Sequence, residues 1–331
     1  MGSPLSLLRF LNAIGGDGSG PAQKGVREER DVTLADGTLV DLYEPAGRCA
    51  QGAVVAVHGV TLNSRRDPRL MQFARALAAS GRLCVVPTLD GLAACEFVER
   101  DLSRLTIAIE FAYARSAAQV ALAGFSYGGS YALVVAAHEA VRTRLDYVFS
   151  VGAYHSLAAL LAHFRTEGET AAPTRVGERE HFVYARLSLA YGFRRDLGLA
   201  LDLVAEMEAL LRSYCDDDAL ETKRRFYEQH LRRLDIFEYL AKHVSPGVLA
   251  ALSPAGRLAR IACPVGLAHA VDDDIVPAGH ARLIAAELAG RPHLRHACVV
   301  TPLLTHVTPS GLLRHGVDLP RLASLLRPLV A

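Results

Sequence analysis

The strongest constraint on the fold is a regular alternation between short apolar runs and amphipathic helical patterns. Residues 52–60 read GAVVAVHGV, and this run with four Val is typical of a strand that is buried on both faces. Residues 68–81 then carry apolar side chains at helical spacing, with a Pro at the start and a Gly at the end, and a second strand-like run follows at 82–89. The order strand, helix, strand predicts a parallel sheet that is covered by helices.

This alternation extends along most of the chain. Ahead of it, the sequence from 31 to 43 alternates around Asp36-Gly37, a pair that favours a tight hairpin turn. We therefore expect an α/β fold with a mostly parallel sheet and helices on both faces. The further patterns predict helices over 96–115, 128–141, 278–290 and 317–329, and strands over 118–125, 145–154, 263–271 and 295–303.

One long segment interrupts the alternation. Residues 156–255 show helical patterns only, and about 100 residues are too many for a plain connecting loop. We expect a helical insertion there, so that the core consists of 30–155 and 256–331. Residues 1–29 are expected to form a flexible tail, since their GGDGSG stretch follows no strand and lacks the Lys and Ser/Thr of a phosphate-binding loop.

Composition narrows the classes of function. The chain has 331 residues, of which 51% are hydrophobic and 21% charged, which is typical of a globular protein and not of a disordered one. The 36 Lys and Arg against 35 Asp and Glu leave a net charge of +1, so the chain lacks the overall positive field that attracts nucleic acid. We therefore expect no nucleic-acid partner.

Cysteine usage and hydropathy place the protein in a reducing compartment. The six Cys are scattered without CxxC pairs or Cys-His spacing suited to zinc, which indicates buried thiols, and we expect no metal and no cofactor. The N-terminus lacks the charged start and the long apolar core of a signal peptide, and no apolar stretch is long enough to span a membrane. These features predict a cytoplasmic protein without a membrane span. The oligomeric state stays open, with a homodimer as one option.

A serine with flanking glycines stands at the predicted end of a strand. Residues 124–129 read GFSYGG and match the GxSxG pattern around Ser126. The motif lies between the apolar run AQVALAGF and a predicted helix, which is the sharp turn that exposes a serine hydroxyl above a parallel sheet. This context predicts that Ser126 is a nucleophile.

A serine hydroxyl needs a general base and a group that orients this base. Such groups gather beyond the carboxyl ends of parallel strands, and His306 follows the predicted strand that ends at Leu303. The acid candidates are Asp272, Asp273 and Asp274, directly after another predicted strand. Spacing alone does not choose among these three carboxylates.

Acyl chemistry also needs hydrogen-bond donors for the negative oxygen that develops in the transition state. The backbone N–H of Tyr127, just after the serine, is one candidate, and the N–H of Val60, after His58-Gly59, is the other. His58 itself is interpreted as a residue that shapes this loop through hydrogen bonds to nearby backbone.

Three arginines follow this loop closely, at Arg65, Arg66 and Arg69. They could bind a carboxylate of a substrate through paired hydrogen bonds. The more ordinary interpretation is a solvated face, or a local ion pair with Asp67.

Together these motifs make the chain resemble the α/β-hydrolase superfamily over about residues 30–331. The resemblance rests on His58-Gly59, GFSYGG, HAVDDDIVP at 269–277 and the late His306, and it implies the α/β-hydrolase fold with the insertion as a helical lid. In the family's pattern the acid stands four residues before Pro, which is Asp273 here, with Asp272 as the fallback. The stretches VHGVTLNSRRDPRL, VGAYHSL, LSPAGRL and PLLTHVTP also resemble an uncharacterised bacterial subgroup of hydrolases.

The functional hypothesis from the sequence is a serine hydrolase that cleaves a small ester or thioester through Ser126, His306 and Asp273. An amidase or a carbon–carbon bond hydrolase with the same three residues is one alternative. A ligand-binding module without catalysis on the same fold is another, because a fold alone does not establish chemistry. Apolar helical faces in the insertion fit either a hydrophobic substrate pocket or plain packing onto the core.

Overall fold

The computed structural model of the chain describes residues 10, 25–170, 180–213, 220–232, 234, 236–291, 293–309 and 318–330. Of the tail expected at 1–29, residues 1–9 and 11–24 lie outside this description. The first strand, β1, spans Val26–Thr33, so the sheet begins four residues before the expected boundary at residue 30. Most side chains of β1 are exposed and several are charged, and such a strand carries no apolar signal. Phe10 is buried and lies edge-on against Phe73, with ring centroids 5.5 Å apart.

The core is one eight-stranded sheet with the order β1-β2-β4-β3-β5-β6-β7-β8. The hairpin expected around Asp36-Gly37 is confirmed, since β1 and β2 pair as antiparallel neighbours, and β2 also runs antiparallel to β4. All later neighbours pair in parallel, as the alternation of strands and helices predicts. The strands after β1 are β2 (Leu39–Pro45), β3 (Ala53–Val57), β4 (Leu83–Pro87), β5 (Val120–Phe125), β6 (Leu145–Val151), β7 (Val265–Ala270) and β8 (His296–Thr301).

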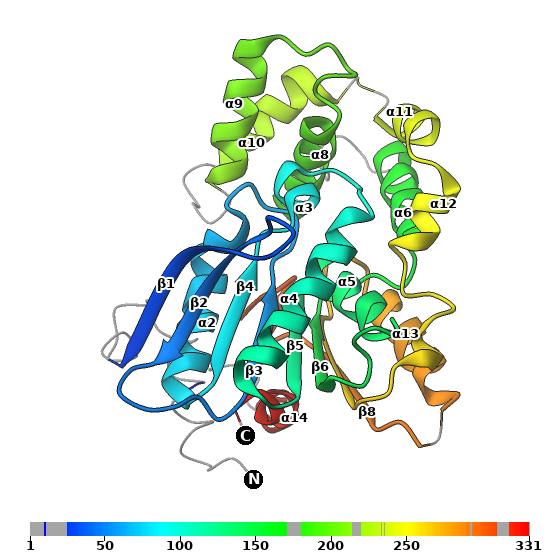
Figure 1. Cartoon of the computed structure of the whole chain (residues 1–331). Helices are drawn as coiled ribbons and strands as arrows, with labels where there is room; N and C mark the ends of the chain where they lie inside the picture. The colour runs from blue at the N-terminus through cyan, green and yellow to red at the C-terminus, as the bar shows by residue number, and fades with distance from the viewer. Residues whose placement is uncertain are drawn as a thin grey trace.

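Helices cover both faces of this sheet, which explains why β3 is apolar at every position. Val55 and Val57 point into the core cluster that contains α4 and α5, whereas Val54 points into the cluster that contains α2 and α14. Figure 1 shows the strands between these helical layers. The helices of the core are α2 (Pro68–Ser80), α3 (Asp90–Ala94), α4 (Arg100–Ser116), α5 (Tyr127–Ala136), α13 (Gly279–Ala289) and α14 (Leu319–Leu326).

The helix expected over 96–115 begins later in the structure, and a short helix that was not expected precedes it. The short helix α3 ends at Cys95, which has a positive φ of 61°, and α4 begins only at Arg100. The carboxylate of Asp101 accepts hydrogen bonds from the backbone N–H groups of Gly91 and Leu92 at 3.1 and 2.9 Å, and so ties the first turns of both helices together. A periodic apolar pattern does not reveal such a break.

A second helical layer is formed by the segment between β6 and β7. Figure 1 shows these helices, coloured green to yellow, on one side of the sheet. Two contacts fix this side: the Tyr184 hydroxyl donates to the carbonyl of Val60 at 3.2 Å, and the Arg212 guanidinium donates to the carbonyl of Leu62 at 3.1 Å. Both carbonyls follow β3, so the segment lies over the carboxyl ends of the parallel strands. Its helices are α6 (Leu157–Thr170), α8 (Glu180–Gly192), α9 (Leu201–Arg212), α10 (Leu220–Phe226), the π-helical turn Tyr227–Leu231, α11 (Ile236–His243) and α12 (Pro246–Ala251).

A small hairpin that the sequence patterns do not predict follows β8. Its strands are β9 (Leu304–Thr305) and β10 (Thr308–Pro309), which pair as antiparallel neighbours. The hairpin places His306 at its turn. Among the residues described, none of the helices has the length and apolar character needed to cross a membrane.

Candidate active site

The turn between β5 and α5 holds Ser126 in an unusual backbone conformation. Its φ is 55° and its ψ is −127°, a region that is costly for a residue with a side chain. A backbone hydrogen bond of 2.7 Å from the Ser126 N–H to the carbonyl of Val151 helps to hold this geometry. The result is a hydroxyl raised at the carboxyl end of the central strand.

Close contacts of the backbone explain the glycines around this serine. A Cβ at Gly124 would lie 2.3 Å from the carbonyl oxygen of Gly128, and one at Gly128 would lie 2.2 Å from the carbonyl oxygen of His58. A Cβ at Gly59 would lie 2.9 Å from the Cβ of Ser126. Only glycine fits at the first two positions without a shift of the backbone.

The structure brings His306 to the serine across 180 residues of sequence. The Nε2 of His306 lies 2.8 Å from the Ser126 Oγ, and its Nδ1 lies 2.8 Å from an oxygen of Asp273. A proton on Nδ1 donates to the carboxylate and leaves Nε2 to accept from the hydroxyl. His306 has a φ of 49°, in the left-handed region, and its side chain is only 4% exposed.

Asp273 is the acid that contacts this imidazole, whereas Asp272 is exposed. One oxygen of Asp273 accepts the backbone N–H groups of Ile275 and Val276 at 3.0 and 2.9 Å, and the other faces His306. Burial alone would raise the pKa of Asp273, but the charge of His306 and hydrogen bonds from both neighbouring imidazoles hold it well below its usual range. The carboxylate is therefore ionised next to His306.

A second imidazole beside Asp273 was not expected from the sequence. His269 Nε2 lies 2.6 Å from the carbonyl oxygen of Val276 and 3.3 Å from the Asp273 carboxylate. It therefore fixes both ends of the turn that carries the acid. The signal that could have found it is the spacing of four residues between His269 and Asp273 in HAVDDD.

The loop after β3 lies against the serine, and His58 shapes it as expected. Its Nδ1 donates to the carbonyl of Gly59 at 2.7 Å, and its Nε2 accepts from the N–H of Leu89 at 3.2 Å. Burial lowers the pKa of His58 to about 4, which keeps the ring neutral. Val60, at the end of this loop, and Tyr127 both line the same cavity as Ser126.

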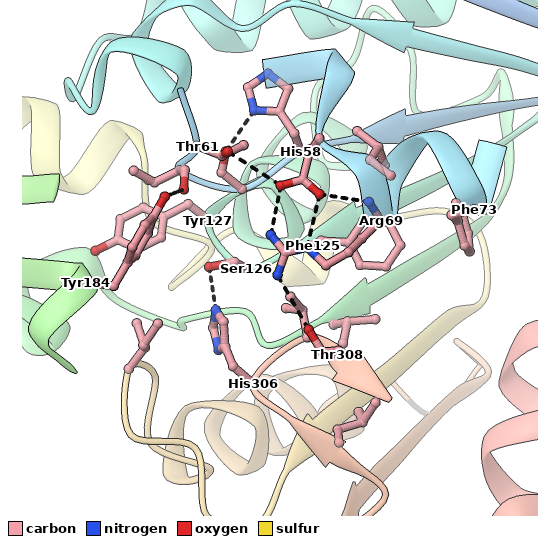
Figure 2. A pocket seen from close by; sticks show the side chains of 18 of the residues that line it. His58, Thr61, Arg69, Phe73, Phe125, Ser126, Tyr127, Tyr184, His306 and Thr308 are labelled. Carbon is pink, nitrogen blue, oxygen red and sulfur yellow. Dashed lines mark hydrogen bonds and ion pairs between the residues drawn. The ribbon is translucent and has the colours of Figure 1, made fainter. Parts of the chain in front are cut away.

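A cavity of about 390 Å³ opens above the serine, and most of its wall is apolar. Figure 2 shows Tyr127 and Tyr184 on one side of Ser126 and Arg69, Phe125 and Phe73 on the other. The cavity is therefore shared between the sheet domain and helix α8, which contributes Tyr184, Ala185 and Leu189. No group of His, Cys, Asp or Glu side chains suited to a metal ion occurs in the described ranges.

The three arginines after this loop differ in their environments. Arg65 is buried and donates to Asp41 at 3.0 Å as well as to Asp31, so the solvated interpretation is wrong for this residue. Arg66 also pairs with Asp31, at 2.6 Å. Only Arg69 pairs with Asp67, at 2.8 Å, and it lines the cavity.

Comparison with solved structures finds this architecture in several hydrolases. A serine hydrolase from Cycloclasticus zankles aligns with a TM-score of 0.53 at 14% identity, over 92% of this chain and 98% of that chain. An esterase from Pyrococcus furiosus aligns with a TM-score of 0.53 at 11% identity, over 94% of each chain. A rice cell wall degrading esterase from Xanthomonas oryzae aligns with a TM-score of 0.52 at 16% identity, over 92% of this chain and 89% of that chain.

The comparisons of the sequence with protein-family models and with curated proteins gave no match. The evidence for the fold is therefore the course of the backbone. The eight-stranded, mostly parallel sheet, its helical layers and the alignment over nine-tenths of the chain agree with one another. The chain has the α/β-hydrolase fold.

Proposed function

We propose that the protein is a serine hydrolase that cleaves an ester or thioester through an acyl-enzyme. The observation that carries the proposal is the continuous hydrogen-bonded chain from Ser126 Oγ through His306 to Asp273, with 2.8 Å at each step. A nucleophile, a base and a group that orients the base are the three parts that such chemistry needs.

In the first half of the reaction, Nε2 of His306 takes the proton of Ser126 while the serine oxygen attacks the carbonyl carbon. The resulting oxyanion accepts hydrogen bonds from the N–H groups of Val60 and Tyr127. The imidazolium, stabilised by Asp273, then gives its proton to the leaving alcohol or thiol, and the acyl group stays on the serine.

In the second half, a water molecule takes the place of the leaving group. His306 removes a proton from this water, the hydroxide attacks the acyl carbon, and the serine leaves with the proton that the imidazolium returns. The products are a carboxylic acid and the free enzyme. The segment 156–255 acts as the lid in this proposal, because its helix α8 forms part of the wall of the cavity that holds Ser126.

The test is the hydrolysis of p-nitrophenyl butyrate by the wild type and by Ser126→Ala. We expect Ser126→Ala to lose activity by about 10⁴-fold or more, because the nucleophile is removed. Ser324→Ala is the matched control, since Ser324 is exposed on α14 and its hydroxyl donates to the carbonyl of Arg321 within the same helix. Equal turnover in the wild type and Ser126→Ala would contradict the proposal.

A further inference from the structure

The wall of the cavity contains one ion pair in otherwise mostly apolar surroundings. Among the described residues that line the cavity, Arg69 is the only Arg or Lys and Asp67 is the only Asp or Glu. The side chain of Arg69 is 31% exposed, while that of Asp67 is 7% exposed. The guanidinium is therefore the part of this pair that a bound molecule can reach.

Several hydrogen bonds fix the guanidinium in place. Its Nε and Nη2 donate to the two oxygens of Asp67 at 3.0 and 2.8 Å, which is a bidentate arrangement. Burial acts to raise the pKa of Asp67, but the hydrogen bonds and charge of Arg69 outweigh it, so the pKa is lowered and the carboxylate is ionised. The pair as a whole thus carries no net charge.

The Arg69–Asp67 pair lies on the side of the site that faces His306. Once protonated, His306 is the general acid that gives its proton to the leaving group. Nη1 of Arg69 lies 3.4 Å from the Thr308 hydroxyl, and Thr308 belongs to the small hairpin that carries His306 at its turn. The imidazolium must reach the leaving oxygen to protonate it, so a leaving group beside His306 has a path along this hairpin toward Arg69. Figure 2 shows Arg69 and Thr308 on this side of Ser126, away from Tyr184.

Beyond the pair, the wall on this side is mostly apolar, with Gln72 of α2 as a polar exception. It is formed by side chains of α2, of the strand ends and of α14, namely Phe73, Phe149, Leu304, Leu322 and Leu326. A leaving group that passes Arg69 therefore meets a hydrogen-bond donor first and a hydrophobic surface afterwards.

We propose that Arg69 determines specificity: it selects esters whose leaving alcohol carries a neutral hydrogen-bond acceptor, such as an ether or ketone oxygen, followed by an apolar chain. This inference rests on the proposed function. A plain alkyl chain would remove the exposed part of the guanidinium from solvent without offering an acceptor, which is unfavourable. A carboxylate would lie next to ionised Asp67, which repels it.

The experiment compares three butyrate esters of similar length: hexyl butyrate, 2-propoxyethyl butyrate, in which one methylene becomes an ether oxygen, and 5-carboxypentyl butyrate. For the wild type we expect kcat/KM to be about tenfold higher for the ether than for the hexyl ester, because a hydrogen bond to a charged donor is gained. The carboxylate ester should be the poorest of the three.

The variants remove the donor without leaving an unpaired buried charge. In the double variant Arg69→Met with Asp67→Asn, the ratio of kcat/KM for ether over hexyl ester should fall to about one, because methionine has no donor. Arg69→Lys should keep part of the preference and serves as the conservative variant. Arg321→Met is the matched control, since Arg321 lies on α14 with its side chain 75% exposed, and it should keep the wild-type ratio.

Three results would count against the role of Arg69. A wild-type ratio near one, a double variant that keeps the preference, or a preference for the carboxylate ester would overturn it. p-Nitrophenyl butyrate is measured in parallel, because it reports on Ser126 alone. Turnover of this reporter without discrimination among the three esters refutes the role of Arg69, whereas no turnover dependent on Ser126 refutes the proposed function itself.

Discussion

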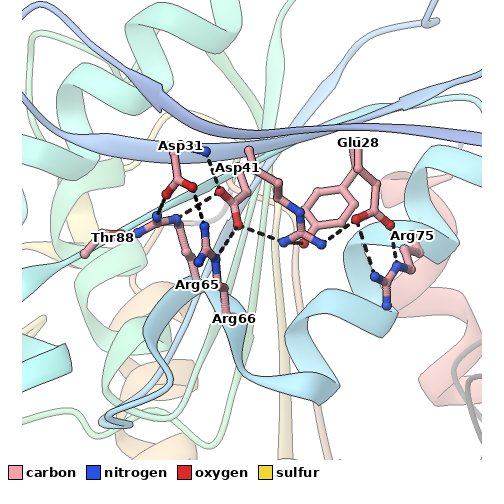
Figure 3. Close-up of polar contacts among 9 residues, drawn as sticks. Glu28, Asp31, Asp41, Arg65, Arg66, Arg75 and Thr88 are labelled. Carbon is pink, nitrogen blue, oxygen red and sulfur yellow. Dashed lines mark hydrogen bonds and ion pairs between the residues drawn. The ribbon is translucent and has the colours of Figure 1, made fainter.

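Two buried carboxylates, Asp273 and Asp41, lie in different surroundings. Asp273 lies at the carboxyl ends of the parallel strands, where it faces the imidazoles of His306 and His269. Asp41 lies on β2 near the sheet edge, is fully buried, and faces arginines instead, with Arg65 at 3.0 Å and Arg30 at 2.8 Å. Figure 3 shows Arg65 and Arg66 beside Asp41 and Asp31.

The partners of the two carboxylates decide what each can do. Guanidinium groups stay charged at every ordinary pH, so the pairs of Asp41 hold one arrangement and transfer no proton. Imidazoles gain and lose protons near neutral pH, so Asp273 can stabilise a charge that appears only during a reaction. We infer that Asp41 stabilises the fold and that Asp273 serves chemistry.

The backbone near Asp41 supports this interpretation. Asp31 has a φ of 57°, at an irregularity in the pairing of β1 with β2, and its N–H donates to Asp41 at 3.0 Å. The irregularity turns the carboxylate of Asp31 toward Arg65 and Arg66. These arginines belong to the turn at 64–66, on the same loop as Gly59, so the charged cluster anchors the loop that borders the serine.

Among the variants that test this comparison, Asp273→Asn should have the largest effect. The asparagine keeps an oxygen for the N–H groups of Ile275 and Val276, but its amide favours the wrong tautomer of His306. We expect kcat for p-nitrophenyl butyrate to fall by about 10⁴-fold, with little change in Tm. Activity within a few fold of the wild type would contradict a role in chemistry.

Asp41→Asn should show the opposite pattern. Removing one partner of a buried ion pair leaves Arg65 poorly compensated, and we expect the free energy of unfolding to drop by about 3 kcal/mol, measured in urea. At 25 °C, kcat should stay close to the wild-type value, because no substrate contact is lost. A large fall in kcat at unchanged stability would show that Asp41 serves chemistry as well, and would contradict the contrast between the two carboxylates.

The next smaller effect is expected for Gly59, on the loop between the charged cluster around Asp41 and the serine. In Gly59→Ala the new methyl group would lie 2.9 Å from the Ser126 Cβ, so the loop or the serine must move. A displacement of this size predicts a loss of about 10²-fold in kcat/KM. The control is Gly279→Ala, where a Cβ meets nothing within 4 Å, and kcat/KM should not change.

The smallest effect at neutral pH is the pH dependence of stability that His58 causes. Burial lowers the pKa of His58 from 6.5 to about 4, so between these values the unfolded chain binds a proton that the folded chain does not. The contribution of His58 is therefore lost as pH falls from about 6.5 toward 4, at up to about 1.4 kcal/mol per pH unit. His58→Gln should flatten this part of the stability curve measured in urea, and an unchanged slope would show that another group causes it.

The sequence predicts the elements that depend on local patterns. The apolar runs of β3 and β5 and the GxSxG turn around Ser126 lie where periodicity places them, because a strand buried on both faces leaves a continuous signal. The same patterns miss the boundary of β1, the short helix α3 and the start of α4. Edge exposure and the hydrogen bonds of Asp101 decide those features, and neither leaves a periodic trace.

Contacts between distant residues are the harder part to predict from sequence. His306 was expected from its place after a strand, but its turn in a small hairpin was not. Arg65 could not be assigned to Asp41, because 24 residues separate them and only the pairing of β2 with its neighbours sets their distance. Spacing identifies candidates, and the packed sheet then determines which of them meet.

The most direct test of the account is the labelling of the protein by a fluorophosphonate, read by intact mass spectrometry and peptide mapping. A serine activated by His306 should form one adduct, on Ser126, in the wild type and in Ser324→Ala, and none in Ser126→Ala or His306→Ala. Wild-type protein that stays unmodified, or that is modified at another serine, would contradict the central claim that folding makes Ser126 a nucleophile.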